Sequence, residues 1–272
     1  MPLATRQFDF LRRLLQQESA IVLDGGKEYL VEARLSPIAE SLGLPDVAAL
    51  LDKLQTAPTA DTRRSVVEAM TTNETSFFRD GHPFDALRTN IFPDLLVARA
   101  AQARLEIWCA ACSTGQEPYS LAILLHELVP DLARWRVRIL ATDLAERMVT
   151  RAREGLYSAA EIGRGMPDHL LQKYFQRDGN RWRVGRQLRS VVEFRQCNLS
   201  APLPQLHAMD LIMLRNVLIY FDVATKRRIL EATGRVLAPD GYLCLGTAET
   251  TLGICDRYQR VTFGKAVFYR WK

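Results

Sequence analysis

The sequence contains no long uninterrupted hydrophobic stretch. None of its apolar runs approaches the roughly 20 residues that a membrane-spanning helix needs, and its N-terminus lacks the apolar core of a signal peptide. We therefore expect a cytoplasmic protein that does not insert into a membrane. With 272 residues, of which 48% are apolar and 25% charged, the chain has the composition of one large or two modest globular domains.

Cysteine is scarce as well, and its pattern argues against metal or disulfide chemistry. The Cys109-x-x-Cys112 spacing would suit a redox or metal site, but no second pair and no histidine cluster completes one. An odd number of cysteines, mostly in or beside predicted strands, favours buried reduced thiols. The five are Cys109, Cys112, Cys197, Cys244 and Cys255.

Charge of one sign is nowhere concentrated. The formal net charge of +5 and the pI near 9.0 are a mild basic excess, which favours an acidic partner. The chain has no recognisable nucleic-acid-binding motif, so we do not expect a nucleic-acid partner. Its short basic clusters are typical of solvated helix faces: Arg12-Arg13, Arg63-Arg64 and Lys226-Arg227-Arg228.

The first 62 residues predict a small helical domain and a linker. Apolar residues recur at helical spacing between residues 8 and 54, and Asp46 is expected to cap a helix after Pro45. The polar, proline-containing stretch 55–62 is interpreted as the linker. Residues 63–272 then form the second domain, which begins with a helix over residues 63–70.

The segment from Ala110 to Ser120 predicts a tight turn of small residues between a strand and a helix. Such a turn lets the backbone and the helix N-terminus approach a bound small molecule. The next predicted strand ends at Asp143, and a carboxylate in that position can bind both hydroxyls of a ribose. The turn lacks the three glycines of a dinucleotide site. Turn and acid together therefore indicate a nucleoside-containing cofactor.

From about residue 104 the pattern alternates strands and helices, which predicts an α/β fold with a largely parallel sheet. Two alternating runs split by Gly264-Lys265 predict a terminal hairpin. Seven strands ending in an antiparallel hairpin resemble the Rossmann-like sheet of class I methyltransferases. A turn over residues 237–241 should start one strand, and a small antiparallel β-subdomain should be inserted at about residues 170–190. The strand candidates are 104–109, 136–142, 191–195, 209–214, 242–246, 259–263 and 266–271.

Four segments, in this order and spacing, resemble the chemoreceptor glutamate O-methyltransferases (CheR family). They are residues 72–79, 110–120, 141–143 and 215–221. The resemblance covers most of residues 60–272. It implies a protein-glutamate O-methyltransferase that uses S-adenosyl-L-methionine, releases S-adenosyl-L-homocysteine and esterifies glutamates on the cytoplasmic helices of a chemoreceptor in sensory adaptation. We expect a monomer.

The resemblance also implies residue roles. Arg79 and Tyr220 are the expected catalytic residues, and Arg79 would also bind the cofactor. The other expected cofactor-binding residues are Asn73, Thr75, Glu117, Asp143, Asn198, Leu199, Arg215 and Asn216.

Four of these roles have a structural alternative. Asp143 would instead cap the following helix, and Glu117 would only stabilise a helix N-terminus. Arg79 would form a salt bridge with Glu74 or Asp80. Tyr220 would be a packed aromatic.

The expected chemistry needs no general base, because a carboxylate is already ionised near neutral pH. The four scattered histidines fit that expectation. Two departures from the family pattern stand out. Residues 27–35 carry charges of both signs, whereas some family members have a strongly basic helix there. The loop over residues 176–181 is short, which predicts a member that needs no receptor C-terminal pentapeptide.

Three other functions remain as alternatives to the glutamate methyltransferase. They are a cofactor-binding signalling module without activity, a nucleic-acid methyltransferase and a nicotinamide dehydrogenase.

Overall fold

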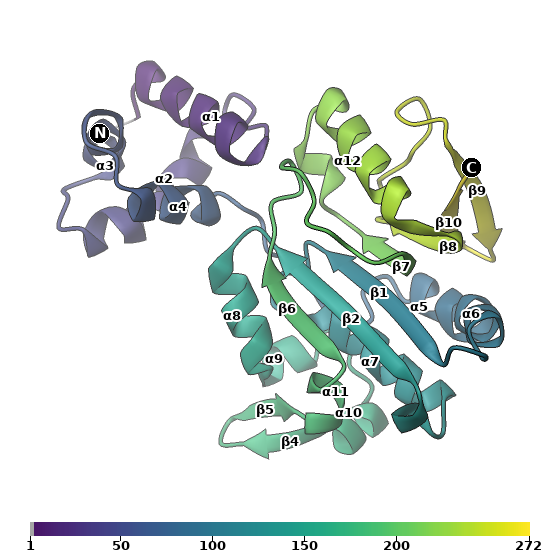
Figure 1. The fold of residues 1–272 in the computed structure, drawn as a ribbon. Coiled ribbons are helices and arrows are strands. Elements are labelled where there is room, and N and C mark those ends of the chain that lie inside the picture. The colour runs from purple at the N-terminus through teal and green to yellow at the C-terminus, as the bar shows by residue number, and fades with distance from the viewer. Residues whose placement is uncertain (1–2) are drawn as a thin grey trace. The chain divides into compact units, whose positions relative to one another are not determined.

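The computed structural model describes residues 3–272, which form two compact units (Figure 1). The first unit runs to Thr72 and includes Tyr220–Thr225, and the second comprises Asn73–Ile219 and Lys226–Lys272. The domain boundary expected between residues 62 and 63 falls inside helix α4 (Ala60–Ala69). Within residues 3–272, no helix combines the length and the apolar character of a membrane span.

The first unit contains helices α1 (Thr5–Ser19), α2 (Glu28–Ser41), α3 (Val47–Thr56) and α4. Leu11, Leu35 and Leu50 are fully buried in its core. The predicted cap is confirmed, since the Asp46 carboxylate accepts a hydrogen bond from the Ala49 amide at 2.8 Å. The expected linker is wrong, because α3 extends to Thr56 and α4 starts only four residues later, so this segment joins two helices of one unit.

The second unit is built on a seven-stranded sheet in the order β6-β2-β1-β7-β8-β10-β9. In this order, each strand from β6 through β2, β1 and β7 to β8 runs parallel to the next one. Strand β10 is antiparallel to both β8 and β9. The predicted sheet with its terminal hairpin is confirmed. The strands are β1 (Arg104–Ala110), β2 (Arg136–Asp143), β6 (Val192–Gln196), β7 (Met209–Leu214), β8 (Leu237–Leu245), β9 (Tyr258–Phe263) and β10 (Ala266–Trp271).

Strand β8 corrects one prediction. It already begins at Leu237, where a turn was expected, and Leu237 pairs with Met209. The next pair is Leu211 with Tyr242, so the intervening residues of β8 form an irregularity in the strand. The Pro-Asp-Gly sequence therefore produces a bulge within the strand, as proline and glycine often do.

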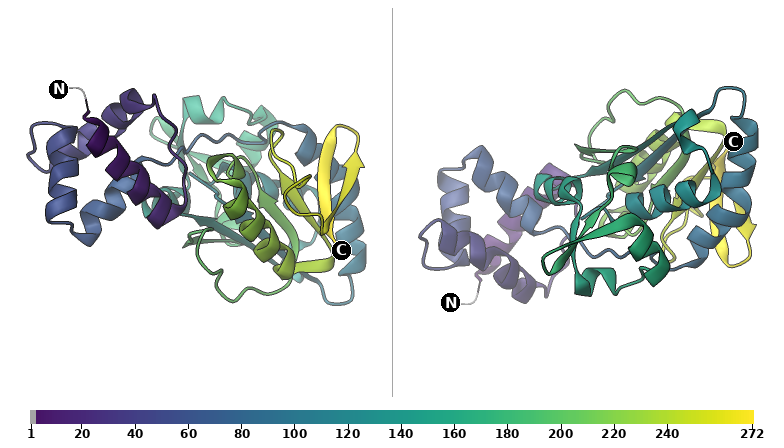
Figure 2. Two further views of the ribbon diagram at one scale, coloured as in Figure 1. Left: turned by 90° about the horizontal axis from the view of Figure 1, so that it is seen from above. Right: turned by 90° about the horizontal axis from the view of Figure 1, so that it is seen from below.

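Helices cover both faces of the sheet. The two views in Figure 2 show α7 on one face and α12 on the other. The helical segments of this unit and its connections are α5 (His82–Ala86), η1 (Leu87–Ile91), α6 (Phe92–Ala98), α7 (Gln116–Leu128), η2 (Leu132–Arg134), α8 (Glu146–Glu154), α9 (Ala159–Ile162), α10 (Asp168–Tyr174), α11 (Arg186–Arg189), η3 (Leu218–Tyr220) and α12 (Val223–Val236).

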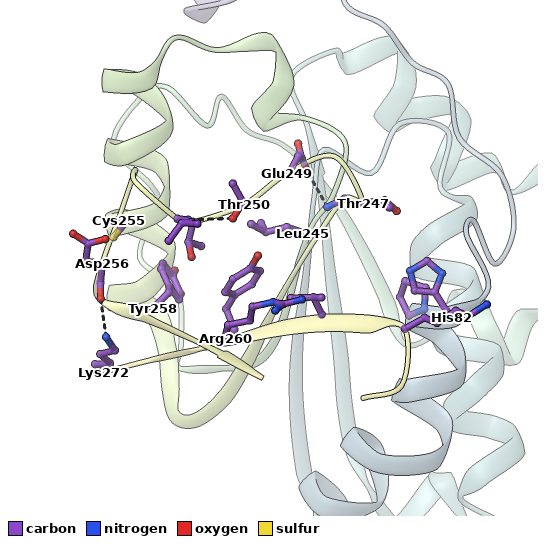
Figure 3. Close-up of a pocket in the computed structure, with 17 residues that line it drawn as sticks. His82, Leu245, Thr247, Glu249, Thr250, Cys255, Asp256, Tyr258, Arg260 and Lys272 are labelled. Carbon is purple, nitrogen blue, oxygen red and sulfur yellow. Dashed lines mark hydrogen bonds between the residues drawn. The ribbon is translucent and has the colours of Figure 1, made fainter. Parts of the chain in front are cut away.

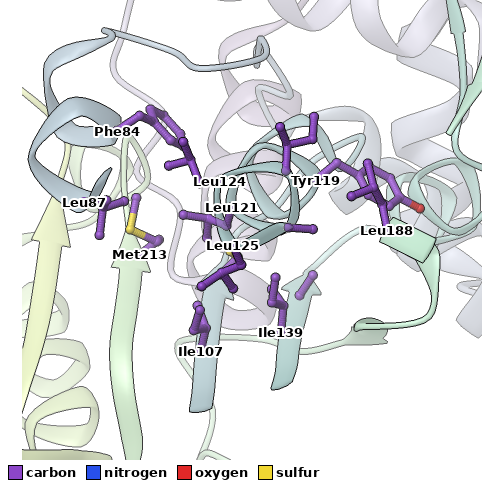
Figure 4. Packing of buried hydrophobic residues seen from close by; sticks show 14 of the residues in the cluster. Phe84, Leu87, Ile107, Tyr119, Leu121, Leu124, Leu125, Ile139, Leu188 and Met213 are labelled. Atoms are coloured by element: carbon purple, nitrogen blue, oxygen red, sulfur yellow. The ribbon is translucent and has the colours of Figure 1, made fainter. Parts of the chain in front are cut away.

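The packing of α7 on the sheet forms the centre of the core (Figure 4). Leu121 and Leu125 of α7 are fully buried, as are Ile107 of β1 and Ile139 of β2. Burying one such side chain contributes about 1.5–3 kcal/mol. This packing fixes the start of α7 relative to the ends of the central strands.

The inserted subdomain is a three-stranded antiparallel sheet in the order β3-β5-β4. The predicted hairpin exists as β4 (Phe175–Asp178) and β5 (Arg181–Val184), joined by Gly179 and Asn180. Two details of the prediction are wrong. The run 171–177, interpreted from the sequence as the first strand of this hairpin, is helical up to Tyr174 as part of α10, and a third strand, β3 (Leu156–Ser158), lies outside the expected range of about 170–190. A strand of three residues is too short to show alternation in the sequence.

Candidate active site

The turn between β1 and α7 has an unusual backbone. Ala111, Ser113 and Gly115 all have positive φ, at 62°, 50° and 91°. A Cβ on Gly115 would lie 2.9 Å from the Cβ of Ala152, so only glycine fits there. Left-handed conformations in non-glycine residues cost free energy and persist only where the surrounding structure holds them. They are most frequent at functional sites. The turn is held in a defined shape at the start of α7.

Asp143 holds this turn against β2. Its Oδ2 accepts a hydrogen bond from the Ser113 amide at 2.7 Å, and its Oδ1 accepts one from the Ala145 amide at 3.0 Å. The second bond lies at the start of α8, so the capping role considered from the sequence exists in part. The first bond orients a buried carboxylate toward the glycine turn. A carboxylate oxygen accepts more than one hydrogen bond.

Arg215, at the end of β7, forms a buried ion-pair cluster. Its guanidinium donates to Glu117 at 2.9 Å and to Asp80 at 2.7 Å. Burial raises the pKa of Glu117 above its usual value, and the charge of Arg215 opposes that shift. Among the described residues, Arg215 Nε is one of two buried side-chain polar atoms without a hydrogen-bond partner. The Glu117–Arg215 contact was not predicted.

Arg79 does not form the salt bridge considered as its alternative. Its Nη1 donates to the backbone carbonyl of Glu74 at 2.8 Å. The Glu74 carboxylate instead pairs with Arg164 at 2.7 Å, and Asp80 pairs with Arg215. Within residues 3–272 the guanidinium of Arg79 makes no other hydrogen bond. Its planar fork remains suited to bind a carboxylate.

The segment that carries Arg79 is fastened to the β1–α7 region by two serines. Ser113 Oγ donates to the carbonyl of Asn73 at 2.8 Å, and the amide of Phe78 donates to Ser120 Oγ at 3.0 Å. Thr75 is half-buried between these contacts. Both serines lie in the predicted turn motif, but their fastening role had no local signal.

The aromatic pair in this segment has the expected structural role. Phe77 is fully buried and belongs to the core cluster, with the ring of Tyr157 packed edge-on at 5.0 Å. Phe78 is partly buried and packs against the ring of Phe84. The sequence predicts that these two phenylalanines pack in the core rather than stack on a ligand; this is confirmed for Phe77, while Phe78 packs against the core.

Asn198 follows Cys197, just beyond the end of β6. The amide of Cys197 donates to the carbonyl of Asp143 at 2.8 Å. Asn198 Oδ1 accepts from the amide and hydroxyl of Ser200, which forms a local turn. Asn198 and Leu199 are both half-buried. The carboxyl ends of β2 and β6 therefore bring these predicted residues together.

Asn216 follows Arg215 in a left-handed conformation with φ of 57°. Its amide donates to the carboxylate of Glu249 at 2.8 Å. Tyr220 ends η3 and belongs to the first unit, where its carbonyl accepts from the Val22 amide at 2.9 Å. Sequence reasoning missed Glu249. Its only signal is an acid three residues after Gly246, beyond the end of β8.

Within residues 3–272, no group of three or more histidine, cysteine, aspartate or glutamate side chains is arranged to hold a metal ion. All five cysteines are free thiols, and only Cys197 is not fully buried. The predicted burial of the thiols is confirmed for four of the five.

The chain matches two family models that together cover most of it. Residues 73–267 match the CheR methyltransferase, SAM binding domain, and residues 6–71 match the CheR methyltransferase, all-alpha domain. The junction between these matches coincides with the division after Thr72. S-adenosylmethionine (SAM) is thus the cofactor of the second unit.

Relatives of similar length support this result. "Chemotaxis protein methyltransferase 1" from Pseudomonas aeruginosa is 41% identical over 276 residues and covers 100% of both chains. "Chemotaxis protein methyltransferase Cher2" from Pseudomonas putida is 39% identical, covering 97% of this chain and 98% of the relative. Among solved structures, a "DhpI-SAH complex structure" aligns over 71% of each chain at 16% identity with a TM-score of 0.33. The chain belongs to the CheR methyltransferase family and combines its all-alpha and SAM-binding domains.

Proposed function

We propose that this protein is a protein-glutamate O-methyltransferase that acts in the cytoplasm on the helical domain of a chemoreceptor. It would convert glutamate γ-carboxylates to methyl esters and release S-adenosylhomocysteine. The observation that carries the proposal is the double contact of Ser113. Its amide binds Asp143 and its hydroxyl binds the Asn73 carbonyl, which joins the segment of Arg79 to the cofactor turn.

The residues at the carboxyl ends of the central strands suit the parts of SAM. Asp143 would accept hydrogen bonds from both ribose hydroxyls. Glu117 is a buried carboxylate that would attract the α-ammonium group, and its ion pair with Arg215 opposes the rise in its pKa that burial causes. Arg215 Nε is a buried donor that lacks a protein acceptor.

The remaining contacts are proposed on the same basis. Asn198 would pair with the adenine edge while Leu199 covers its face, since both lie just beyond β6. Asn73, Thr75 and Asn216 would line the methionine end of the cofactor. The family relationship supports these roles, and the described geometry is compatible with them.

The reaction requires alignment more than acid–base catalysis. SAM supplies an electrophilic methyl group on its sulfonium. The incoming glutamate is already ionised near neutral pH, so this chain needs no residue to remove a proton. Arg79, anchored through one nitrogen to Glu74, would orient the substrate carboxylate with its other donors. For Tyr220 the proposed catalytic role rests on the family relationship alone.

The proposal can be tested with SAM that carries a labelled methyl group. The protein is incubated with the cytoplasmic fragment of a chemoreceptor from the same host. We expect labelled protein from which mild base releases methanol, because esters hydrolyse under those conditions. Label that survives base treatment would mean N- or O-alkylation and would reject the carboxylate assignment.

We also propose that the protein acts as a monomer and needs no tether to the receptor C-terminus. The β4–β5 hairpin turns in two residues, Gly179 and Asn180, and offers little loop for holding a peptide. Docking would use the first unit, although its basic side chains Arg12 and Arg63 already contact Asp9 and Glu18. Calorimetric titration with a receptor C-terminal pentapeptide should give no heat of binding, and tight binding would contradict this proposal.

A further inference from the structure

Glu249 uses both carboxylate oxygens to bind backbone amides from two strand ends. Oε2 accepts from Asn216 at 2.8 Å and from Gly246 at 2.7 Å. Oε1 accepts from Val217 at 2.9 Å and from Ile219 at 3.3 Å. Figure 3 shows the bond between Glu249 and Gly246 as a dashed line. One side chain therefore fixes the loop after β7 against the end of β8.

The loop needs this support. Asn216 has φ of 57°, a left-handed conformation that asparagine adopts more readily than most residues but that its surroundings still help to stabilise. Gly246 allows the close approach, because a Cβ there would lie 2.7 Å from Glu249 Oε2 and 2.8 Å from the Asn216 amide. The carboxylate and the glycine thus act together on the same backbone.

The fixed loop carries residues of the proposed cofactor site. Arg215 is held on its other side by Glu117 and Asp80, so Glu249 completes the support of the Arg215-Asn216 pair. We propose that Glu249 is a positioning residue for SAM binding. Its carboxylate holds residues 216–219 in the conformation that binds the cofactor, without touching the cofactor itself. This inference rests on the proposed roles of Arg215 and Asn216.

The test compares wild type with E249Q by calorimetric titration of S-adenosylhomocysteine and by hydrogen exchange. In E249Q an amide nitrogen replaces one oxygen and faces backbone N–H donors, so the loop loses acceptors. We expect affinity to fall about tenfold, a change of about 1.4 kcal/mol. The amides of Asn216, Val217 and Ile219 should exchange faster, while those of β1 should not.

Two outcomes would overturn the proposal. The first is wild-type affinity in E249Q, whatever the exchange rates. The second is weakened affinity with wild-type exchange of the loop amides, because the loop would then not have moved. If E249Q does not fold, E249D keeps both oxygens on a side chain one methylene shorter and should give an intermediate loss of affinity.

Two further variants separate this inference from the site assignment. Asp46→Asn also converts a carboxylate that accepts a backbone amide, at the N-terminus of helix α3, and should keep wild-type affinity. Asn216→Ala tests the site itself: unchanged affinity there would reject the proposed cofactor contact of Asn216. Whether or not Asn216→Ala changes the affinity, the affinity and hydrogen exchange of E249Q test whether Glu249 positions the loop.

Discussion

Arg215 and Glu117 form a buried ion pair in which Nη1 lies 2.9 Å from Oε2. The side chain of Arg215 is 2% exposed and that of Glu117 12% exposed, so neither charge is solvated by bulk water. Asp80 binds the second terminal nitrogen of the same guanidinium at 2.7 Å. The pair joins the end of β7 to the start of α7, the two elements on which the proposed site depends.

Replacing Arg215 with Leu should destabilise the protein strongly. The change leaves the buried Glu117 carboxylate without its partner, which typically costs about 3–5 kcal/mol. The double variant Arg215→Leu, Glu117→Gln should recover part of that loss, because its buried carboxylate is gone. Urea denaturation of the two single variants and the double variant measures this coupling. Strictly additive losses would contradict the ion pair.

Asp143→Asn should weaken SAM binding more than it weakens folding. The amide still has one oxygen to accept a backbone hydrogen bond, but it cannot accept from both ribose hydroxyls and from Ser113 and Ala145 together. We expect an affinity loss of about tenfold or more, equivalent to at least about 1.4 kcal/mol. Titration of S-adenosylhomocysteine gives the affinity, and urea denaturation gives the stability. A large stability loss with unchanged affinity would assign Asp143 to helix capping alone.

The contribution of Asp240 to stability should depend on pH. Arg99 donates two hydrogen bonds to this carboxylate at 2.9 and 2.5 Å, and they hold the pKa of Asp240 below its usual value of 3.8. The folded state therefore binds the proton less readily than the unfolded state. The stabilisation is fully present above the unfolded pKa and is lost as the pH falls through the lower folded pKa.

Asp240→Asn lacks this titration. The difference in unfolding free energy between wild type and this variant should be largest at neutral pH and should shrink below about pH 4, the usual range of an aspartate pKa. Urea denaturation at a series of pH values measures it. A difference that stays constant with pH would contradict the prediction.

The thiols should react in an order set by burial. Burial raises the pKa of Cys109 and Cys112 well above the ordinary value, so neither forms the reactive thiolate near neutral pH. Cys197 is partly exposed and should be alkylated first in the native protein. Mass spectrometry of peptides after brief alkylation checks the order. Rapid labelling of Cys112, or a Cys109–Cys112 disulfide, would contradict this prediction and support a redox role for the pair.

Local sequence patterns predicted the elements that depend on neighbouring residues. Alternation on both sides of Gly264-Lys265 predicted the terminal hairpin, and Gly264 has the positive φ of a two-residue turn. Asp46 was predicted as a cap because capping joins residues only three positions apart. The strand end at Asp143 was predicted for a similar reason, since an apolar run stops there.

The features that were missed depend on contacts between distant segments. Glu249 lies 33 residues from Asn216, and Arg215 lies 135 residues from Asp80. No local pattern in one sequence indicates such pairs. The bulge in β8 was mistaken for a turn because proline, aspartate and glycine favour both, and only the pairing of Leu237 with Met209 distinguishes them.

The most direct test of the proposed function is to locate the transferred methyl groups. A receptor cytoplasmic fragment is incubated with the protein and SAM, digested, and sequenced by tandem mass spectrometry. We predict methyl groups on glutamate side chains in the helical region, and at least about tenfold fewer when Asp143→Asn replaces the wild-type protein at limiting SAM. Methyl groups on lysine, arginine or histidine, or on no residue of any receptor from the host, would contradict the proposal.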